Sequence, residues 1–254
     1  MLNPAWLDAM AEAFWGAAGG APPAFPRGLE PAILYATPLA IVSLPRLRPR
    51  AVDAWLARHG AAPVLDEGDG RLHACLVVAA GSGLVFLDGA DPPDQRRFSL
   101  AHELAHYLLD YLRPRARALE ALGPGIGAVL DGRRPPALPE RVHAALAGVP
   151  LGVHRHLLAY DDPAVAGQER AADRLAVELL APAAAAVPLA RAVGRAPYAA
   201  RLAAVARTLA ADFGLPAAVA EGYAARLLRH LGAEPSFAEW LGLPGSGPSG
   251  GPGR

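Results

Sequence analysis

One stretch of the chain decides its fold, and it reads Arg97-Phe98-Ser99-Leu100-Ala101-His102-Glu103-Leu104-Ala105-His106-Tyr107-Leu108-Leu109. Helical spacing puts His102 and His106 one turn apart on the same face, so two imidazoles can point at one ion. Glu103 lies beside that ion, where a general base for a metal-bound water is needed. The stretch predicts half of a zinc site, which still needs a third protein ligand and an open fourth position.

A second helical stretch, residues 168–182, offers the missing ligand. Glu169 and Asp173 are one turn apart on one face, flanked by the small residues Ala172 and Ala176. Small residues let this helix approach the first one closely, so we expect Glu169 to complete a zinc site of two histidines and one carboxylate. Asp173 could then accept the remaining ring N–H of a ligand histidine and fix its tautomer.

The same two motifs also have simpler explanations that involve no metal. The two histidines could lie on the surface of an unremarkable helix, and Glu169 could pair with Arg170 or Arg174 in solvent. Glu178, within an apolar run farther along, is a weaker candidate for the third ligand.

The composition indicates a globular protein. Apolar residues make up 53% and charged residues 19% of 254 residues, which suits one domain of about 150–200 residues with appendages. Lysine plus arginine equals aspartate plus glutamate at 24 each, so no basic excess favours nucleic acid. The single cysteine, Cys75, excludes an intramolecular disulfide and is expected to be a small buried hydrophobe.

No stretch of about 18 apolar residues is free of charge or proline, so no membrane-spanning segment is predicted. The N-terminus lacks the basic region of a signal peptide. We therefore expect a soluble, cytoplasmic protein.

The order of the predicted elements indicates an α+β fold, in which a small, mostly antiparallel sheet backs the His-Glu-x-x-His helix. Residues 1–31 are expected to form an N-terminal helix and a proline-rich connector. The core, residues 32–182, has a predicted strand at Leu39–Leu44, a helix at Val52–His59 and a hairpin of Leu72–Ala79 with Leu84–Leu87.

Within this core, the metal-binding helix is expected to begin between Asp91 and Gln95 and to end at Pro114. Residues 113–160 then look like an insertion with one helix near Glu140–Leu146, and its histidines, His143, His154 and His156, are interpreted as solvated.

A helical region, residues 183–243, follows the core. Ala183–Pro197 is expected to be a linker, followed by helices at Leu202–Phe213 and Pro216–Leu231 around Gly214, a spacing shared by helix-turn-helix units. Arg226 and Arg229 could meet phosphate there, although solvated arginines are commoner. The tail, residues 244–254, lacks apolar residues and is predicted to be disordered.

The two motif stretches together resemble the ImmA/IrrE family of zinc metallopeptidases, as does the strand Leu84–Asp88 shortly before Arg97. The resemblance implies zinc on His102, His106 and Glu169, with Glu103 as the catalytic base. It also implies a cytoplasmic endopeptidase that cleaves helix-turn-helix repressors and so relieves repression of stress or mobile-element genes. The residue that stabilises the oxyanion, Tyr107 or Tyr160, stays open, as does the oligomeric state.

The sequence therefore favours a zinc-dependent endopeptidase that acts on a protein substrate. The alternative is a non-catalytic regulator that binds a repressor or DNA and keeps a structural metal site. The intact Glu103 and the zero net charge favour the enzyme.

Overall fold

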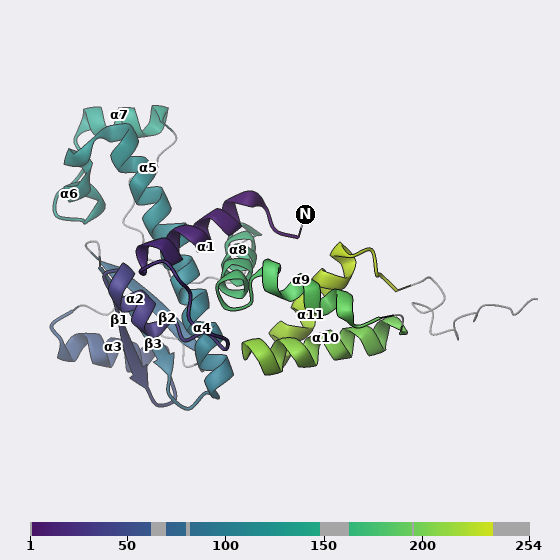
Figure 1. Cartoon of the computed structure of the whole chain (residues 1–254). Helices are drawn as coiled ribbons and strands as arrows, with labels where there is room; N and C mark the ends of the chain where they lie inside the picture. Colours follow the sequence, from purple (N-terminus) through teal and green to yellow (C-terminus); the bar gives the residue numbers. More distant parts are fainter. Residues whose placement is uncertain (1, 62–69, 80–81, 148–162, 195, 236–254) are drawn as a thin grey trace, which may run out of the picture. The chain divides into compact units, whose positions relative to one another are not determined.

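The computed structural model describes residues 2–61, 70–79, 82–147, 163–194 and 196–235 (Figure 1). Contacts between Cα atoms divide the chain into two units. We call Ala5–Leu180 the sheet unit, and Met1–Pro4 with Ala181–Arg254 the C-terminal unit. The predicted domain bounds at 31, 182 and 243 stay predictions.

The sheet unit contains a three-stranded sheet in the order β1-β3-β2, formed by β1 (Leu39–Leu44), β2 (Ala74–Ala79) and β3 (Ser82–Asp88). The predicted hairpin is confirmed, because β2 and β3 are antiparallel. β1, however, runs parallel to β3, so the expected mostly antiparallel sheet is wrong and the sheet is mixed. Helix α3 (Pro49–Arg58) lies in the crossover that a parallel pair requires.

The sheet separates α3 from α4 (Pro93–His106), as Figure 1 shows. On the α3 side, Val52 and Leu56 pack with Leu47 and Phe86. Half-buried Cys75 packs against this cluster, which confirms its predicted role as a small hydrophobe. Alternation along the strands sends the other buried side chains, Leu76, Val78, Val85 and Leu87, to the opposite face, where α4 packs on β2 and β3.

A buried carboxylate fixes the connection from β3 to α4. Asp88 accepts hydrogen bonds from the backbone N–H groups of Arg46 and Ala90 and from Nε of Arg71, each at 2.9 Å. Burial alone would raise the pKa of Asp88, but these donors outweigh it and hold the pKa below its ordinary value. The start of α4 is thereby tied to the end of the central strand.

The helix that carries the motif does not end at Pro114. After α4 the chain makes a π-helical turn, η1 (Tyr107–Leu112), and continues as α5 (Arg113–Leu122). Pro114 lies in the first turn of α5, where a missing backbone N–H costs little. The predicted helix end was therefore wrong, because the π turn re-sets the hydrogen-bond pattern just before the proline.

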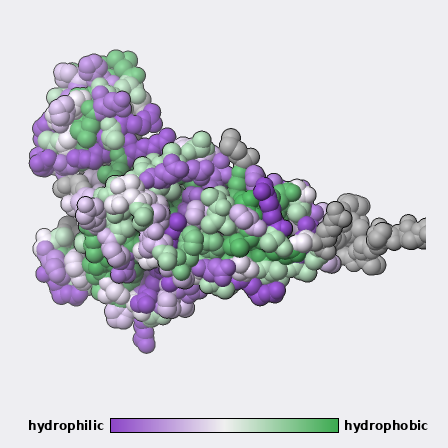
Figure 2. Space-filling model, in the orientation of Figure 1, coloured by the Kyte–Doolittle hydropathy of each residue, from purple (hydrophilic) through white to green (hydrophobic). Residues whose placement is uncertain are grey.

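The insertion begins with α5 and has its own small core. Helices η2 (Pro124–Ile126), α6 (Gly127–Leu130) and α7 (Leu138–Leu146) follow. The small core is a cluster of four buried residues, Ala118, Ile126, Val129 and Leu130. Helix α7 confirms the predicted helix and carries the exposed His143. Figure 2 shows apolar patches among the hydrophilic residues of the insertion. The side chains of Leu138, Val142 and Leu146 on α7 are exposed. His154 and His156 lie outside the described residues.

Three further helices complete the sheet unit: α1 (Ala5–Ala17), α2 (Glu30–Ala36) and α8 (Pro163–Leu180). The N-terminal helix is confirmed, and α1 packs on α8. Helix α2 begins inside the segment predicted as a connector. Helix α8 packs extensively on α4, and Ala172 and Ala176 are fully buried on the α8 face that carries Glu169.

The C-terminal unit consists of α9 (Ala183–Ala192), α10 (Tyr198–Phe213) and α11 (Ala217–His230) in its described part. The predicted linker was wrong, since its alanine run has strong helix propensity and forms α9 despite Pro188. The two later helices are confirmed, and Gly214 between them is left-handed at φ 65°. Their helix-turn-helix character stays a prediction, and residues 236–254 lie outside the described part.

Within the described residues, no single helix is long and apolar enough to cross a membrane, although α8 and α9 taken as a pair pass that test by length and composition.

The close approach of α8 to α4 predicts that enlarging a buried alanine is costly. Ala176→Leu should lower the free energy of unfolding by about 1–3 kcal/mol, because a well-packed interface cannot absorb three extra carbons. Thermal and urea unfolding measure the effect. The control is Ala203→Leu, at an exposed position of α10, which should change stability by less than about 0.5 kcal/mol. Equal stability of the two variants would contradict close packing here.

Candidate metal centre

Three predicted ligands meet where α4 packs on α8. One donor atom each from His102, His106 and Glu169 lie within 4.8 Å of one another. The Nε2 atoms of the two histidines are 3.0 Å apart, and each lies 3.2 Å from a carboxylate oxygen of Glu169. The structure thus places Glu169 beside two histidines that lie at least 63 positions earlier in the sequence.

The outer nitrogen of each histidine is held by a second carboxylate. Nδ1 of His102 lies 3.0 Å from Oδ1 of Asp173, and Nδ1 of His106 lies 2.7 Å from Oδ2 of Asp110. An ionised carboxylate can only accept a hydrogen bond, so in both rings Nδ1 carries the proton. Each Nε2 then presents its lone pair to the centre of the site.

This arrangement fits a cation. When both rings are neutral, their Nε2 lone pairs and the carboxylate converge on one point, where they repel each other unless a positive charge, either a metal ion or a proton, lies between them. Two zinc–nitrogen bonds of about 2.0–2.1 Å at a tetrahedral angle would place the nitrogens about 3.3 Å apart, close to the observed spacing. Two histidines and one carboxylate are also a donor set that zinc prefers in hydrolytic sites.

The electrostatics of His102 agree with this fit. Burial alone would lower its pKa, but hydrogen bonds to Asp173 and Glu169 and the nearby charge of Glu103 raise the pKa to about 10. Surrounding carboxylates therefore favour positive charge at this point.

One side of the site is accessible. The side chains of His102 and Glu169 are 15% and 19% exposed, whereas the side chain of His106 is fully buried. A catalytic zinc site has three protein ligands and one open position, whereas a structural site is closed by four. The partial exposure of two donors suits a catalytic site with one open position.

Glu103 lies beside these donors and has only 6% of its surface exposed. The backbone N–H of Leu76 on β2 donates a hydrogen bond to its carboxylate. Burial raises the pKa of Glu103, and the charge of Glu169 adds to this effect, while both histidines oppose it. A carboxylate with a raised pKa is a stronger proton acceptor.

Asp110 was not among the residues predicted for the site. It lies four residues after His106, within the π turn, and the two side chains form a close pair. Its signal was available, since an aspartate one turn beyond a ligand histidine is a natural acceptor for the outer ring N–H. The aspartate reaches His106 from the same helix, while Asp173 reaches His102 from α8.

The remaining candidates are placed elsewhere or lie outside the described residues. Glu178 is buried on α8 and is not one of the three converging donors. Tyr107 is fully buried with its ring stacked on Tyr111, and burial raises its pKa to about 12. Tyr160 lies outside the described part of the chain.

Comparison with known families addresses the same region. Residues 65–123 match the model of the IrrE N-terminal-like domain, which describes a peptidase family. The match confirms the resemblance to ImmA/IrrE peptidases, and comparison with curated proteins and with solved structures gave no significant match.

The matched segment spans β2, β3, α4 and α5, and so includes His102, Glu103 and His106. It ends before α8, so the assignment of Glu169 rests on the structure. Peptidases of this family depend on a metal, which agrees with the three donors that converge here. The family match and the converging donors together support a metallopeptidase.

Asp110 provides a direct test of how the site is built. Asp110→Asn should weaken zinc binding about 10–100-fold, because the charged acceptor that orients His106 is lost while the shape is kept. Competition with a chromophoric chelator measures the affinity. Glu120→Gln, an exposed charge removal on α5, is the control and should leave the affinity unchanged. An unchanged affinity in Asp110→Asn would show that this pair does not support the site.

The thiol of Cys75 should react slowly in the folded protein. Burial raises its pKa to about 12, so far less reactive thiolate is present at pH 8 than for an unfolded cysteine near pKa 8.5. We expect reaction with a disulfide reagent at pH 8 to be at least about a hundredfold slower than in urea, because rate follows thiolate fraction and access. The native rate should keep rising as the pH approaches 12. Equal rates in buffer and urea would contradict this burial.

Proposed function

We propose that the protein is a zinc-dependent endopeptidase whose substrate is another protein. The observation that carries the proposal is the convergence of His102, His106 and Glu169 beside a buried carboxylate, Glu103. The peptidase family of residues 65–123 supports the same chemistry.

Zinc, when bound by these three residues, would polarise the scissile carbonyl and lower the pKa of a water in its open position. His102 and His106 hold their donor atoms in place through the carboxylates of Asp173 and Asp110. Because both outer nitrogens are engaged, the rings cannot turn away from the centre without breaking a hydrogen bond.

Glu103 is the residue that moves a proton. Its carboxylate would accept a proton from the attacking water and then deliver it to the nitrogen of the leaving amine. Its raised pKa suits the first step, and the hydrogen bond from Leu76 holds it next to the ligand histidines. Asp173 and Asp110 position the ligands and do not contact the reacting atoms.

The substrate we propose is a transcriptional repressor with a helix-turn-helix domain. The family resemblance supports this, since cleavage of such repressors relieves repression of stress or mobile-element genes. A repressor substrate would also place the protein in the cytoplasm. The competing function, a regulator with a purely structural metal, is less favoured, because the described residues supply three converging donors rather than four and include an intact base.

Glu103→Gln separates catalysis from metal binding. The variant should keep zinc at the wild-type level, because none of the three ligands is changed, and should lose about 10²–10⁴-fold in peptidase rate with the base. Cleavage of a defined mixture of peptides that covers many sequences, followed by mass spectrometry, measures the rate whichever sequence the enzyme prefers. Metal analysis of the same samples measures zinc.

The matched control is Glu12→Gln, an exposed charge removal on α1, which should cleave like the wild type. A zinc-loaded wild type that cleaves no peptide and no helix-turn-helix repressor would favour the regulator instead. Wild-type activity in Glu103→Gln would remove this residue from the mechanism.

A further inference from the structure

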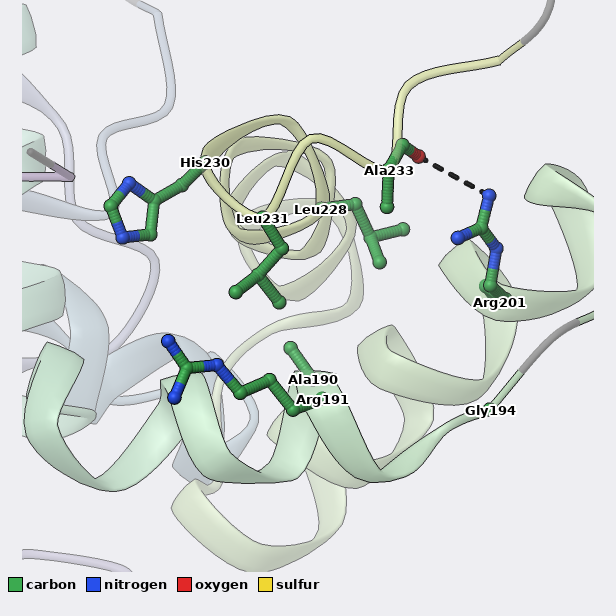
Figure 3. Close-up of a pocket in the computed structure, with 8 residues that line it drawn as sticks. All are labelled: Ala190, Arg191, Gly194, Arg201, Leu228, His230, Leu231 and Ala233. Atoms are coloured by element: carbon green, nitrogen blue, oxygen red, sulfur yellow. Dashed lines mark hydrogen bonds between the residues drawn. The ribbon is translucent and has the colours of Figure 1, made fainter.

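The C-terminal unit contains a pocket of its own, formed where α9, α10 and α11 pack together (Figure 3). Its volume is about 480 Å³, within the range of small-molecule sites. The lining residues are Ala190, Arg191, Gly194, Arg201, Leu228, His230, Leu231 and Ala233. None of them takes part in the metal centre.

Three basic side chains, one from each helix, line this pocket. Arg191 comes from α9, Arg201 from α10 and His230 from α11. Figure 3 shows the two arginines on either side of Leu228 and Leu231, with His230 on the side of Arg191. No acidic residue is among the lining residues that the structure describes.

Two helix ends oppose this positive charge, but they do not cancel it. The C-terminal ends of α9 and α11 lie at the pocket, and each contributes about half a negative charge. The two arginines contribute two full positive charges, so the pocket stays positive by about one charge even with His230 neutral. Protonation of His230 would add to it.

Arg201 lacks part of its hydrogen bonding. One terminal nitrogen donates to the carbonyl oxygen of Ala233 at 3.3 Å, but the buried Nε–H has no partner in the described part of the chain. A buried donor without a partner costs about 1–3 kcal/mol. This nitrogen is too buried for a ligand in the pocket to contact it, so Arg201 would act on a ligand through its charge.

The charge of the surrounding sequence also favours the binding of an anion. Residues 181–235 contain six arginines and only three acidic residues, although the whole chain has a net charge of zero. The positive excess is therefore local to the unit that contains the pocket, where it attracts anions.

We propose that this pocket binds a small organic anion through a carboxylate or phosphate group. The anionic group would lie on the Arg191 side of the two leucines, near His230, since a guanidinium group binds both kinds of oxyanion through paired N–H donors. The apolar part of the ligand would contact Leu228 and Leu231. The volume of the pocket suits a small molecule of this kind rather than a duplex.

Titration calorimetry of the full chain with phenyl phosphate and with benzoate tests the proposal and distinguishes the two anionic groups. Benzyl alcohol is the uncharged control. We expect saturable binding of at least one anion at a single site and no binding of the alcohol. Arg191→Gln should raise the Kd about tenfold or more, as the loss of a charge-assisted hydrogen bond does, and Arg201→Gln should raise it by a smaller factor through the loss of a nearby charge.

Arg207→Gln is the matched control, because Arg207 is exposed on α10 and does not line the pocket. This variant should bind like the wild type. Arg191→Gln is itself an exposed change, so it keeps the test valid if Arg201→Gln fails to fold. Absence of saturable binding would overturn the proposal, as would equal weakening by all three variants, which is the behaviour of a diffuse basic surface for nucleic acid.

Discussion

The close packing of α8 against α4 is the constraint on which the site depends. Ala172 and Ala176 are fully buried on the face of α8 that also carries Glu169, so the two helix backbones can approach each other. A glutamate side chain on α8 can reach both Nε2 atoms of the histidine pair only when the two helices lie close together. Strands β2 and β3 pack on α4, and the buried Asp88 fixes the loop that leads into it.

The outer carboxylates give the site its polarity. Asp173 and Asp110 accept hydrogen bonds from the Nδ1–H groups of the two histidines, which leaves three electron-pair donors directed at a single point. Such convergence is unfavourable without a cation and favourable with one. Each histidine ring needs a hydrogen-bond acceptor on its own outer side. The two aspartates therefore come from different helices.

Local spacing made much of this predictable. His102, Glu103 and His106 follow from helical periodicity within one segment, and Glu169 follows from a second segment with small neighbours. The parallel pairing of β1 with β3 did not, because hydrophobic patterns show strands but not which distant strand they join. The continuation past Pro114 depends on the π turn, which changes the register of the helix without a sequence signal of its own. The role of Asp110 was overlooked, although its spacing of four residues from His106 was a usable signal. Helix α9 was missed because an alanine run with Pro188 resembles a linker.

The metal content of purified protein tests the central claim most directly. Wild type, Glu169→Ala and Glu178→Gln should be compared by elemental analysis after identical zinc loading and removal of excess metal. We predict about one zinc per chain in the wild type and in Glu178→Gln, which changes a buried α8 glutamate outside the donor set, and a large loss in Glu169→Ala. Equal zinc content in the wild type and in folded Glu169→Ala would contradict this assignment of the ligands. A loss of zinc in Glu178→Gln would contradict it as well.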